Sequence, residues 1–227
     1  MNKKIIRHLA LTAASSLIMA SVSAQVTTEV LRDFSACDAG FFRSLARAIP
    51  ATETPSTIAR RGDIAWFKVK NRKEEADNHI NFTPPLNVAG LKLLSYFDDA
   101  SDLDEFGKFY SWGFIAEGSL DQVTATLKPL IRDANRLRRD DNMYARSELK
   151  IGKAPWRAVD LSSGSVPLPT TVERVLILEP SDDSNSVRVT CSLQGSVTGD
   201  LLKDERPDID AADYPGAPAD GASSRHQ

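Results

Sequence analysis

The sequence predicts an α+β fold in which two helices pack on antiparallel sheet built from two tandem helix-plus-three-strand units. Three observations predict it. The order helix, strand, loop, strand, turn, strand occurs twice, at about residues 33–118 and 119–195. The only two cysteines lie on the apolar faces of a predicted helix and a predicted strand, where one disulfide would join them. The composition, 41% hydrophobic and 26% charged, is that of a globular domain. The six strands would form either two three-stranded sheets or one continuous sheet.

The chain begins with the features of a secretory signal peptide. A basic start, an uncharged apolar stretch and small residues before a cleavage site follow in order: Lys3, Lys4 and Arg7, then Leu9–Ala20, then Val22, Ser23 and Ala24. The apolar stretch is shorter than the roughly 18 residues that cross a membrane, and no later segment approaches that length. We therefore expect cleavage after residue 24 and export to the periplasm or beyond, rather than a chain that opens with a buried helix.

The mature chain would be acidic. Removing the three basic residues of the signal peptide from the total of 28 leaves 25 against 31 acidic residues, a net charge of −6. This balance does not indicate nucleic acid or an anionic membrane as the main partner.

Export bears on Cys37 and Cys191, because two thiols in an oxidising compartment usually form a disulfide. Cys37 would lie on the apolar stripe of a helix predicted over residues 36–49, with Ser35 as its N-terminal cap. Cys191 lies in a strand predicted over residues 187–194, in which apolar and polar side chains alternate. Both sulfur atoms would face the core, so we expect a bridge rather than two separate buried thiols. In the chain-entropy account so long a loop stabilises the fold by on the order of 4–5 kcal/mol.

The repeat is carried by a G-x3-W-x2-V spacing. Its members are Gly62, Trp66 and Val69 in the first copy and Gly152, Trp156 and Val159 in the second. In each copy an apolar run, an acidic turn and a further strand follow. The last strand of the first copy, residues 108–116, is apolar on both faces. Either a strand buried on both sides or one face used for association would explain this, and we expect central burial in the sheet.

The helix of the second copy begins after Ser119, with Gln122 completing a capping box. Apolar residues at helical spacing continue to Leu137, although Pro129 should kink or shorten the helix. Four arginines lie near its predicted end: Arg132, Arg136, Arg138 and Arg139. They would either meet an anionic partner or form a solvated face at the negative end of the helix dipole.

His79 is the single histidine of the predicted folded domain, because His8 leaves with the signal peptide and His226 lies near the C terminus. As a general base it would need an orienting carboxylate such as Asp77. The sequence has no G-x-S-x-G nucleophile motif, so a polar histidine in a loop is the simpler interpretation. It also has no phosphate-binding glycine motif and no paired histidine or cysteine motif. We therefore expect no cofactor and no metal.

Acidic residues crowd the first predicted hairpin: Asp98, Asp99, Asp102, Asp104 and Glu105. Their spacing does not fit a calcium-binding loop, which places a glycine at its sharp turn. Carboxylates at hairpin tips stay hydrated and deter edge pairing, but such a patch also steers association with a basic partner. We expect these five residues to supply the contact with a protein partner.

Composition predicts that residues 210–227 form a disordered tail, which leaves 25–209 as one folded domain. Export, a disulfide, an acidic surface and the lack of a recognisable catalytic set favour a soluble, non-catalytic binding protein of the cell envelope. An inhibitor or an immunity protein for a secreted enzyme would fit this description. The alternative is a periplasmic hydrolase that uses His79 as its general base.

Overall fold

The computed structural model describes residues 26–160, 167–182 and 185–214, so the predicted signal peptide and residues 215–227 lie outside the described residues. The described chain contains four α-helices: α1 (Thr28–Phe34), α2 (Gly40–Ala48), α3 (Leu120–Leu127) and α4 (Gly199–Glu205). It also contains ten strands: β1 (Ile58–Arg61), β2 (Ile64–Phe67), β3 (His79–Val88), β4 (Leu91–Asp102), β5 (Lys108–Glu117), β6 (Arg138–Asp140), β7 (Met143–Ile151), β8 (Arg157–Val159), β9 (Thr171–Pro180) and β10 (Ser186–Gly195). The α+β class is confirmed.

Eight of these strands form one antiparallel sheet in the order β3-β4-β5-β10-β9-β7-β6, with β8 also paired to β7. The structure therefore has one continuous sheet rather than two. β5 and β10 pair in its interior, with Trp112 opposite Cys191. The outer side of β7 is covered by two short strands, β6 along its first half and β8 along its second. β1 and β2 form a separate hairpin.

The two copies of the G-x3-W-x2-V spacing lie in different surroundings. Trp66 belongs to β2, within the separate hairpin. Trp156 immediately precedes β8, which pairs with the large sheet. Gly62 and Gly152 both follow a strand and have positive φ, 58° and 52°. The shared spacing therefore corresponds to a shared backbone turn and not to equivalent strands.

The first helix differs from the prediction at its start, because the chain turns at Cys37. Cys37 has a left-handed φ of 57°, which interrupts a right-handed helix, and α2 begins only at Gly40. The prediction of one helix over 36–49 with Ser35 as its N-terminal cap was therefore wrong. Ser35 is the C-terminal cap of α1, a helix that the sequence analysis did not find. Asp38 accepts a hydrogen bond of 2.7 Å from the Gly40 amide at the start of α2.

The start of the second helix is confirmed. Ser119 and Gln122 form the reciprocal hydrogen bonds of a capping box at the N terminus of α3. The helix ends at Leu127, because Pro129 has no amide hydrogen with which to continue it. The residues that follow form short 3₁₀ turns, so the apolar pattern up to Leu137 is not helical.

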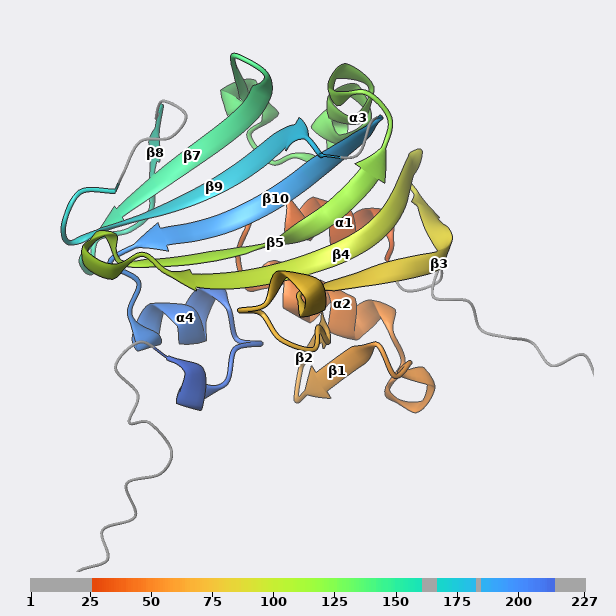
Figure 1. Ribbon diagram of the computed structural model, residues 1–227, viewed down its shortest axis with the longest axis horizontal. Coiled ribbons are helices and arrows are strands. Elements are labelled where there is room, and N and C mark those ends of the chain that lie inside the picture. Colours follow the sequence, from red (N-terminus) through yellow and green to blue (C-terminus); the bar gives the residue numbers. More distant parts are fainter. Residues whose placement is uncertain (1–25, 161–166, 183–184, 215–227) are drawn as a thin grey trace, which may run out of the picture.

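All four helices and the β1–β2 hairpin lie on one face of the large sheet, and no helix of the described residues covers the other face (Figure 1). The core lies between these layers. Aromatic rings dominate it under β4 and β5, with centroids of neighbouring rings 4.6–6.4 Å apart: Phe34, Phe41, Phe67, Tyr96 and Phe114. Each such pair adds about 0.5–1.5 kcal/mol to the stabilisation from buried area.

The predicted disulfide is confirmed. The bond between Cys37 and Cys191 joins the turn between α1 and α2 to the middle of β10, with the two Cα atoms 5.1 Å apart. Both cysteines are completely buried. The bond therefore anchors the helical layer to an interior strand of the sheet.

The folded part of the chain continues past the expected boundary at residue 209. After α4, Arg206 and Asp208 are buried, residues 211–213 form the 3₁₀ helix η7 (Ala211–Asp213), and Tyr214 packs against the core. Arg206 and Asp208 lie within the domain expected from composition, and the two opposite charges are internal because each compensates the other.

Candidate functional site

A cleft of about 650 Å³ opens beside the hairpin of β4 and β5. Three segments that are distant in sequence form its walls: the loop at residues 69–73 after β2, the strands β4 and β5, and C-terminal residues between 209 and 214. Its volume lies within the roughly 300–1,000 Å³ that is typical of small-molecule sites. The cleft is therefore one candidate site.

A buried ion network ties the three walls of this cleft together. Arg206 donates hydrogen bonds to Asp98 of β4 at 2.9 and 3.0 Å, and to Asp208 at 2.8 and 2.9 Å. Arg72, in the loop wall, donates to the same two carboxylates at 2.8 Å each. The side chains of Arg206, Asp98 and Asp208 have no exposed surface. Two arginines against two aspartates leave the network neutral, so each buried charge is compensated.

The network sets the protonation states of its members. Burial alone would lower the pKa of Arg206, but the charges of Asp208 and Asp98 raise it above its usual value. Burial alone would raise the pKa of Asp208, but the charge and hydrogen bonds of Arg206 hold it below its usual value. Tyr96 is buried beside the network, and burial followed by the charge of Asp98 raises its pKa well above the usual value. Arg206 and Asp208 are therefore ionised at neutral pH, while Tyr96 is neutral.

The groups that face the cleft are mostly hydrogen-bond donors. Lys108 of β5 forms an ion pair with Asp102 of β4. The hydrogen bond from Lys108 lowers the pKa of the Asp102 carboxyl, and the nearby charge of Lys73 lowers it further. The ammonium of Lys73 and the phenol groups of Tyr110 and Tyr214 have no hydrogen bond to another described residue.

This set, which includes Arg72, Arg206, Lys73 and Lys108, has no pattern in the sequence that would predict it. Their positions in the sequence are scattered, and isolated lysines and arginines look like ordinary surface residues. One local signal was present for Asp98: it lies two residues after Tyr96 in the same strand and therefore shares its inward face.

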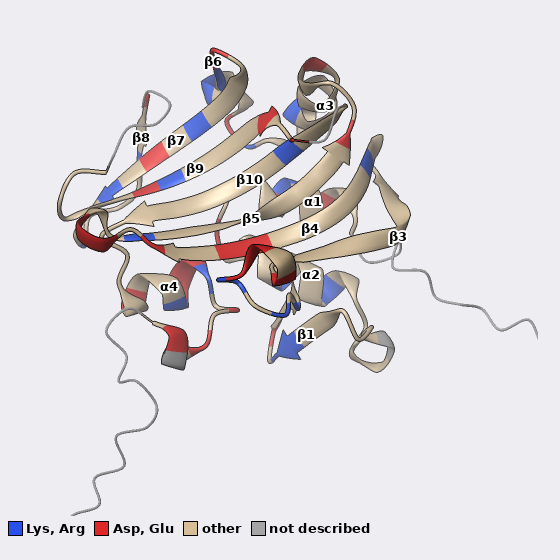
Figure 2. Cartoon of the chain, viewed as in Figure 1, with Lys and Arg blue, Asp and Glu red and all other residues tan. Residues whose placement is uncertain are grey.

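The structure distributes the five acidic residues of the hairpin over separate environments (Figure 2). Asp98 points into the core, whereas Asp99 lies on the opposite face of β4, where partial burial raises its pKa. Asp102 lines the cleft. Asp104 and Glu105 are exposed in η4 (Asp104–Phe106), the turn that connects β4 and β5. Successive strand residues face opposite sides, so neighbours in the sequence do not form one acidic surface.

Every large apolar side chain that is exposed in the described part of the chain lies at one end of the large sheet. These side chains, which we call the apolar edge, are Leu103 (39% exposed), Phe106 (51%), Ile151 (44%) and Leu168 (72%). Leu103 and Phe106 belong to the β4–β5 turn, Ile151 ends β7, and Leu168 lies three residues before β9. The strand register places the start of β5, the end of β10, the start of β9 and the end of β7 side by side (Figure 1).

His79 lies at the exposed start of β3 and is not among the residues that line the cleft. Its side chain has no hydrogen bond or ion pair with another described residue. Asp77, the carboxylate expected to orient it, accepts hydrogen bonds from Lys70 at 2.8 and 2.9 Å. The structure therefore does not assemble the histidine–carboxylate pair.

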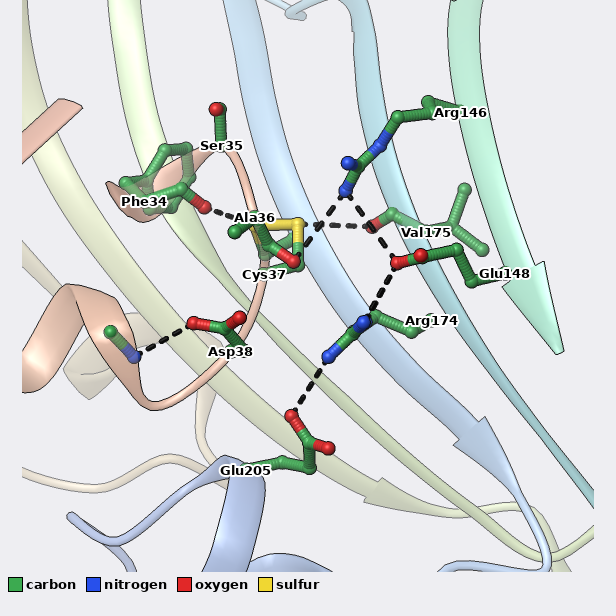
Figure 3. Close-up of a disulfide and its surroundings, with 12 residues drawn as sticks. Phe34, Ser35, Ala36, Cys37, Asp38, Arg146, Glu148, Arg174, Val175 and Glu205 are labelled. Atoms are coloured by element: carbon green, nitrogen blue, oxygen red, sulfur yellow. Dashed lines mark hydrogen bonds and ion pairs between the residues drawn. A yellow bond between two sulfur atoms is a disulfide. The ribbon is translucent and has the colours of Figure 1, made fainter. Parts of the chain in front are cut away.

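A second ion network lies beside the disulfide (Figure 3). Arg174 of β9 donates to Glu148 of β7 at 3.0 Å and to Glu205 of α4 at 2.9 Å. The Trp156 indole donates to Glu205 at 2.7 Å, and Arg146 donates to a carbonyl of the α1–α2 turn at 3.5 Å. These charged side chains are between 2% and 15% exposed. Because their charges are opposite and lie within 4 Å of one another, we interpret this network as a structural support for α4 and the turn.

The four arginines of the predicted second helix do not share a helical face. Arg136, Arg138 and Arg139 border a small cleft of about 250 Å³ beside β6 and β8, and each donates a hydrogen bond to another group of the protein. Arg132 lies at a different cleft, beside α2 and α4. The expected cationic stripe was wrong, because the helix ends before these residues.

Within the described ranges, no group of three or more His, Cys, Asp or Glu residues is placed to hold a metal ion. No helix of that part is long and apolar enough to cross a membrane. Comparisons with protein-family models, curated proteins and solved structures found no match to this chain. Its function is therefore argued from geometry and chemistry.

Proposed function

We propose that the chain is an exported, non-catalytic binding protein that contacts a protein partner through the apolar edge. One observation carries this proposal: all four large apolar side chains exposed in the described residues gather at one end of the sheet. Single apolar residues on a surface need no explanation, whereas a cluster favours an interaction site. The four residues come from three connections, so no one loop accounts for the cluster.

Two exposed carboxylates indicate the kind of partner. Asp104 and Glu105 lie between Leu103 and Phe106 in the same turn. An apolar contact with an acidic border favours a basic partner, because complementary charges accelerate association and exclude other partners. An inhibitor or immunity protein that binds a basic secreted enzyme would use such a surface. The other three acidic residues of the hairpin contribute less, because they are buried, half-buried or ion-paired.

Export belongs to the same proposal. The bond between Cys37 and Cys191 supports an oxidising compartment, where disulfides persist. The predicted signal peptide would deliver the mature chain to the periplasm or beyond.

The hydrolase alternative has less support. A general base needs a group that holds its ring and its tautomer, and the described residues supply none for His79. We expect His79→Ala to leave partner binding and thermal stability unchanged. Loss of a hydrolytic activity in this variant at unchanged stability would restore the alternative.

We also propose that the sheet arose from two tandem units. β3, β4 and β5 form one antiparallel meander after α2, and β7, β9 and β10 form another after α3. The last strands of the two, β5 and β10, pair antiparallel where the meanders meet, as a two-fold relation between units would require. The test is to superpose the two units in an experimental structure. Coincident helices and strands would support a duplication, and helices on non-equivalent sides of the meanders would contradict it.

Partner binding would be tested with the oxidised, tagged mature chain as bait on envelope and culture-supernatant fractions, with mass spectrometry as the readout. The matched variant is Leu103→Ser combined with Phe106→Ser. Both side chains are exposed, so this variant should keep the unfolding midpoint of the parent chain. We expect one stoichiometric partner with the parent chain and its loss with the variant.

A pair of charge variants then tests the acidic border. Asp104→Lys with Glu105→Lys should slow association with the captured partner and alter its salt dependence. The control is Glu29→Lys with Asp63→Lys, which makes the same change in net charge at exposed positions of α1 and the β1–β2 turn. Equal association rates for the two charge variants, or full capture by the serine variant, would exclude the apolar edge as the interface.

A further inference from the structure

We propose that the cleft beside the β4–β5 hairpin binds a small anion that carries a carboxylate or a phosphate group. The residues that line the cleft do not include those of the apolar edge, and the proposal does not depend on the protein partner. It follows from three properties of the cleft: the unused donors in its walls, the surplus of positive charge at one wall, and the ion network that holds the walls in place.

Several hydrogen-bond donors in this cleft are unused. Lys73 has no side-chain partner in the described chain, and Lys108 engages only Asp102. The hydroxyl groups of Tyr110 and Tyr214 also have no partner among the described residues. A ligand that satisfies these groups must present several acceptor oxygens. Carboxylates and phosphates do so, and their hydrogen bonds to ammonium groups are among the strong ones.

The distribution of charge favours an anion over a neutral acceptor. Lys73 and Lys108 both lie near Asp102, so two positive charges stand against one negative charge at this wall. The other cations of the lining, Lys70 and Arg72, are already paired with carboxylates that do not line the cleft. The surplus positive charge is therefore localised between β5 and the loop that carries Lys73.

The C-terminal wall of the cleft carries a negative charge. Asp213 of η7 lines the cleft, and its carboxylate has no ion-pair partner in the described residues. It would repel a second anionic group and accept a hydrogen bond from a hydroxyl or an ammonium group. The ligand is thus expected to direct its anionic group toward Lys73 and Lys108, and a hydroxyl or amino group toward Asp213.

The walls are positioned without a ligand. Arg72 ties the loop to β4 through Asp98 and to the C-terminal segment through Asp208. The Ala100 amide of β4 also donates to the Arg72 carbonyl at 3.0 Å. A site that is already ordered needs little reorganisation when a ligand binds, so little of the interaction energy is lost to ordering its walls.

Isothermal titration calorimetry on the oxidised chain tests the proposal at constant ionic strength. The probes are L-malate, which carries carboxylates and a hydroxyl, sn-glycerol 3-phosphate, which carries a phosphate and hydroxyls, and glycerol as the neutral control. We expect saturable binding of at least one anion and none of glycerol. Binding of malate alone identifies a carboxylate ligand, and binding of glycerol 3-phosphate alone identifies a phosphate ligand.

Two double variants with the same change in charge locate the site. Lys73→Gln with Lys108→Gln should raise the Kd by about tenfold or more, because it removes the two ammonium donors. Lys128→Gln with Lys153→Gln, at exposed lysines outside the cleft, should leave the Kd unchanged. The aromatic NMR signals of Tyr110 and Tyr214 should shift on saturation with the anion.

The proposal is overturned if neither anion binds saturably, if glycerol binds as tightly as the anions, or if the two double variants have the same Kd. The variant with Lys73→Gln alone should still capture the protein partner as the parent chain does, since Lys73 belongs to the loop after β2 and not to the turn that carries Leu103 and Phe106. Failure of this proposal is thereby distinguishable from failure of the proposed function.

Discussion

Arg206 and Asp98 are completely buried and hydrogen-bonded to each other, although 108 residues separate them in the sequence. Asp98 lies within β4, and Arg206 directly follows α4. The pair therefore fastens the C-terminal segment to the sheet. The guanidinium carbon of Arg206 also lies 4.3 Å from the centroid of the Trp112 ring, so packing and charge hold the same side chain.

Replacing Asp98 with Asn is expected to destabilise the fold by about 3–5 kcal/mol, because it leaves part of the charge of Arg206 and Arg72 buried without a counterion. Urea denaturation at pH 7 measures the free energy of unfolding. The control is Lys92→Gln, which breaks the half-exposed ion pair with Glu117 and should cost less than about 1 kcal/mol. Similar losses in the two variants would mean that the buried network is no stronger than a surface pair.

The loss of folding stability at acidic pH should depend on Asp208. Because its pKa is lower in the folded chain than in the unfolded chain, ionised Asp208 contributes stability above the ordinary aspartate value of about 4. That contribution is lost as the pH falls from about 4 through the lower folded-state pKa, since the unfolded chain then takes up the proton first. Asp208→Asn should be less stable at pH 7 and lose stability less steeply below pH 4. Unfolding free energies of the parent chain and the variant, measured from pH 7 to 2.5, test this. An equally steep loss of stability below pH 4 in both proteins would contradict it.

The elements that sequence analysis located depend on residues close together in the chain. The capping box needs only Ser119 and Gln122, and the buried face of β10 follows from strict alternation around Cys191. Strand 108–116, apolar on both faces, is indeed paired on both sides within the sheet. In each case the residues that determine the element lie within one short stretch of sequence.

The features that escaped prediction depend on distant partners. The break before α2 arises from the positive φ of Cys37, where the helical spacing of apolar residues continues through the turn. Arg206 and Asp208 look like ordinary surface charges in the sequence until Asp98 and Arg72 are placed beside them. The apolar edge likewise exists only once the sheet register brings three connections together, and Ile151 or Leu168 alone carries no such signal.

Reduction of the disulfide should be slow in the native state, and loss of the bond should lower the free energy of unfolding. Both cysteines are inaccessible, so a thiolate reaches the bond only after local or global opening. The variant with Cys37→Ala and Cys191→Ala should lose on the order of 4–5 kcal/mol of unfolding free energy in the chain-entropy account. Thiol alkylation followed by mass spectrometry, with and without urea, measures the protection. Rapid native-state reduction would show that the α1–α2 turn opens readily.

The turn that carries Leu103 and Phe106 depends on a glycine that packs against a second glycine. Gly107 has a φ of 95°, and a Cβ at this position would collide with the Gly195 carbonyl oxygen at the end of β10. Gly107→Ala should therefore cost about 1–3 kcal/mol in backbone strain, with a further loss from the collision. It should also displace the turn and so weaken capture of the partner.

Gly62→Ala is the matched control, because Gly62 has a φ of 58° but nothing within 4 Å of the added Cβ. It should cost only about 1–2 kcal/mol and leave capture intact. Thermal unfolding and the capture assay measure both effects, and equal behaviour of the two alanine variants would mean that the contact with Gly195 does not hold the turn.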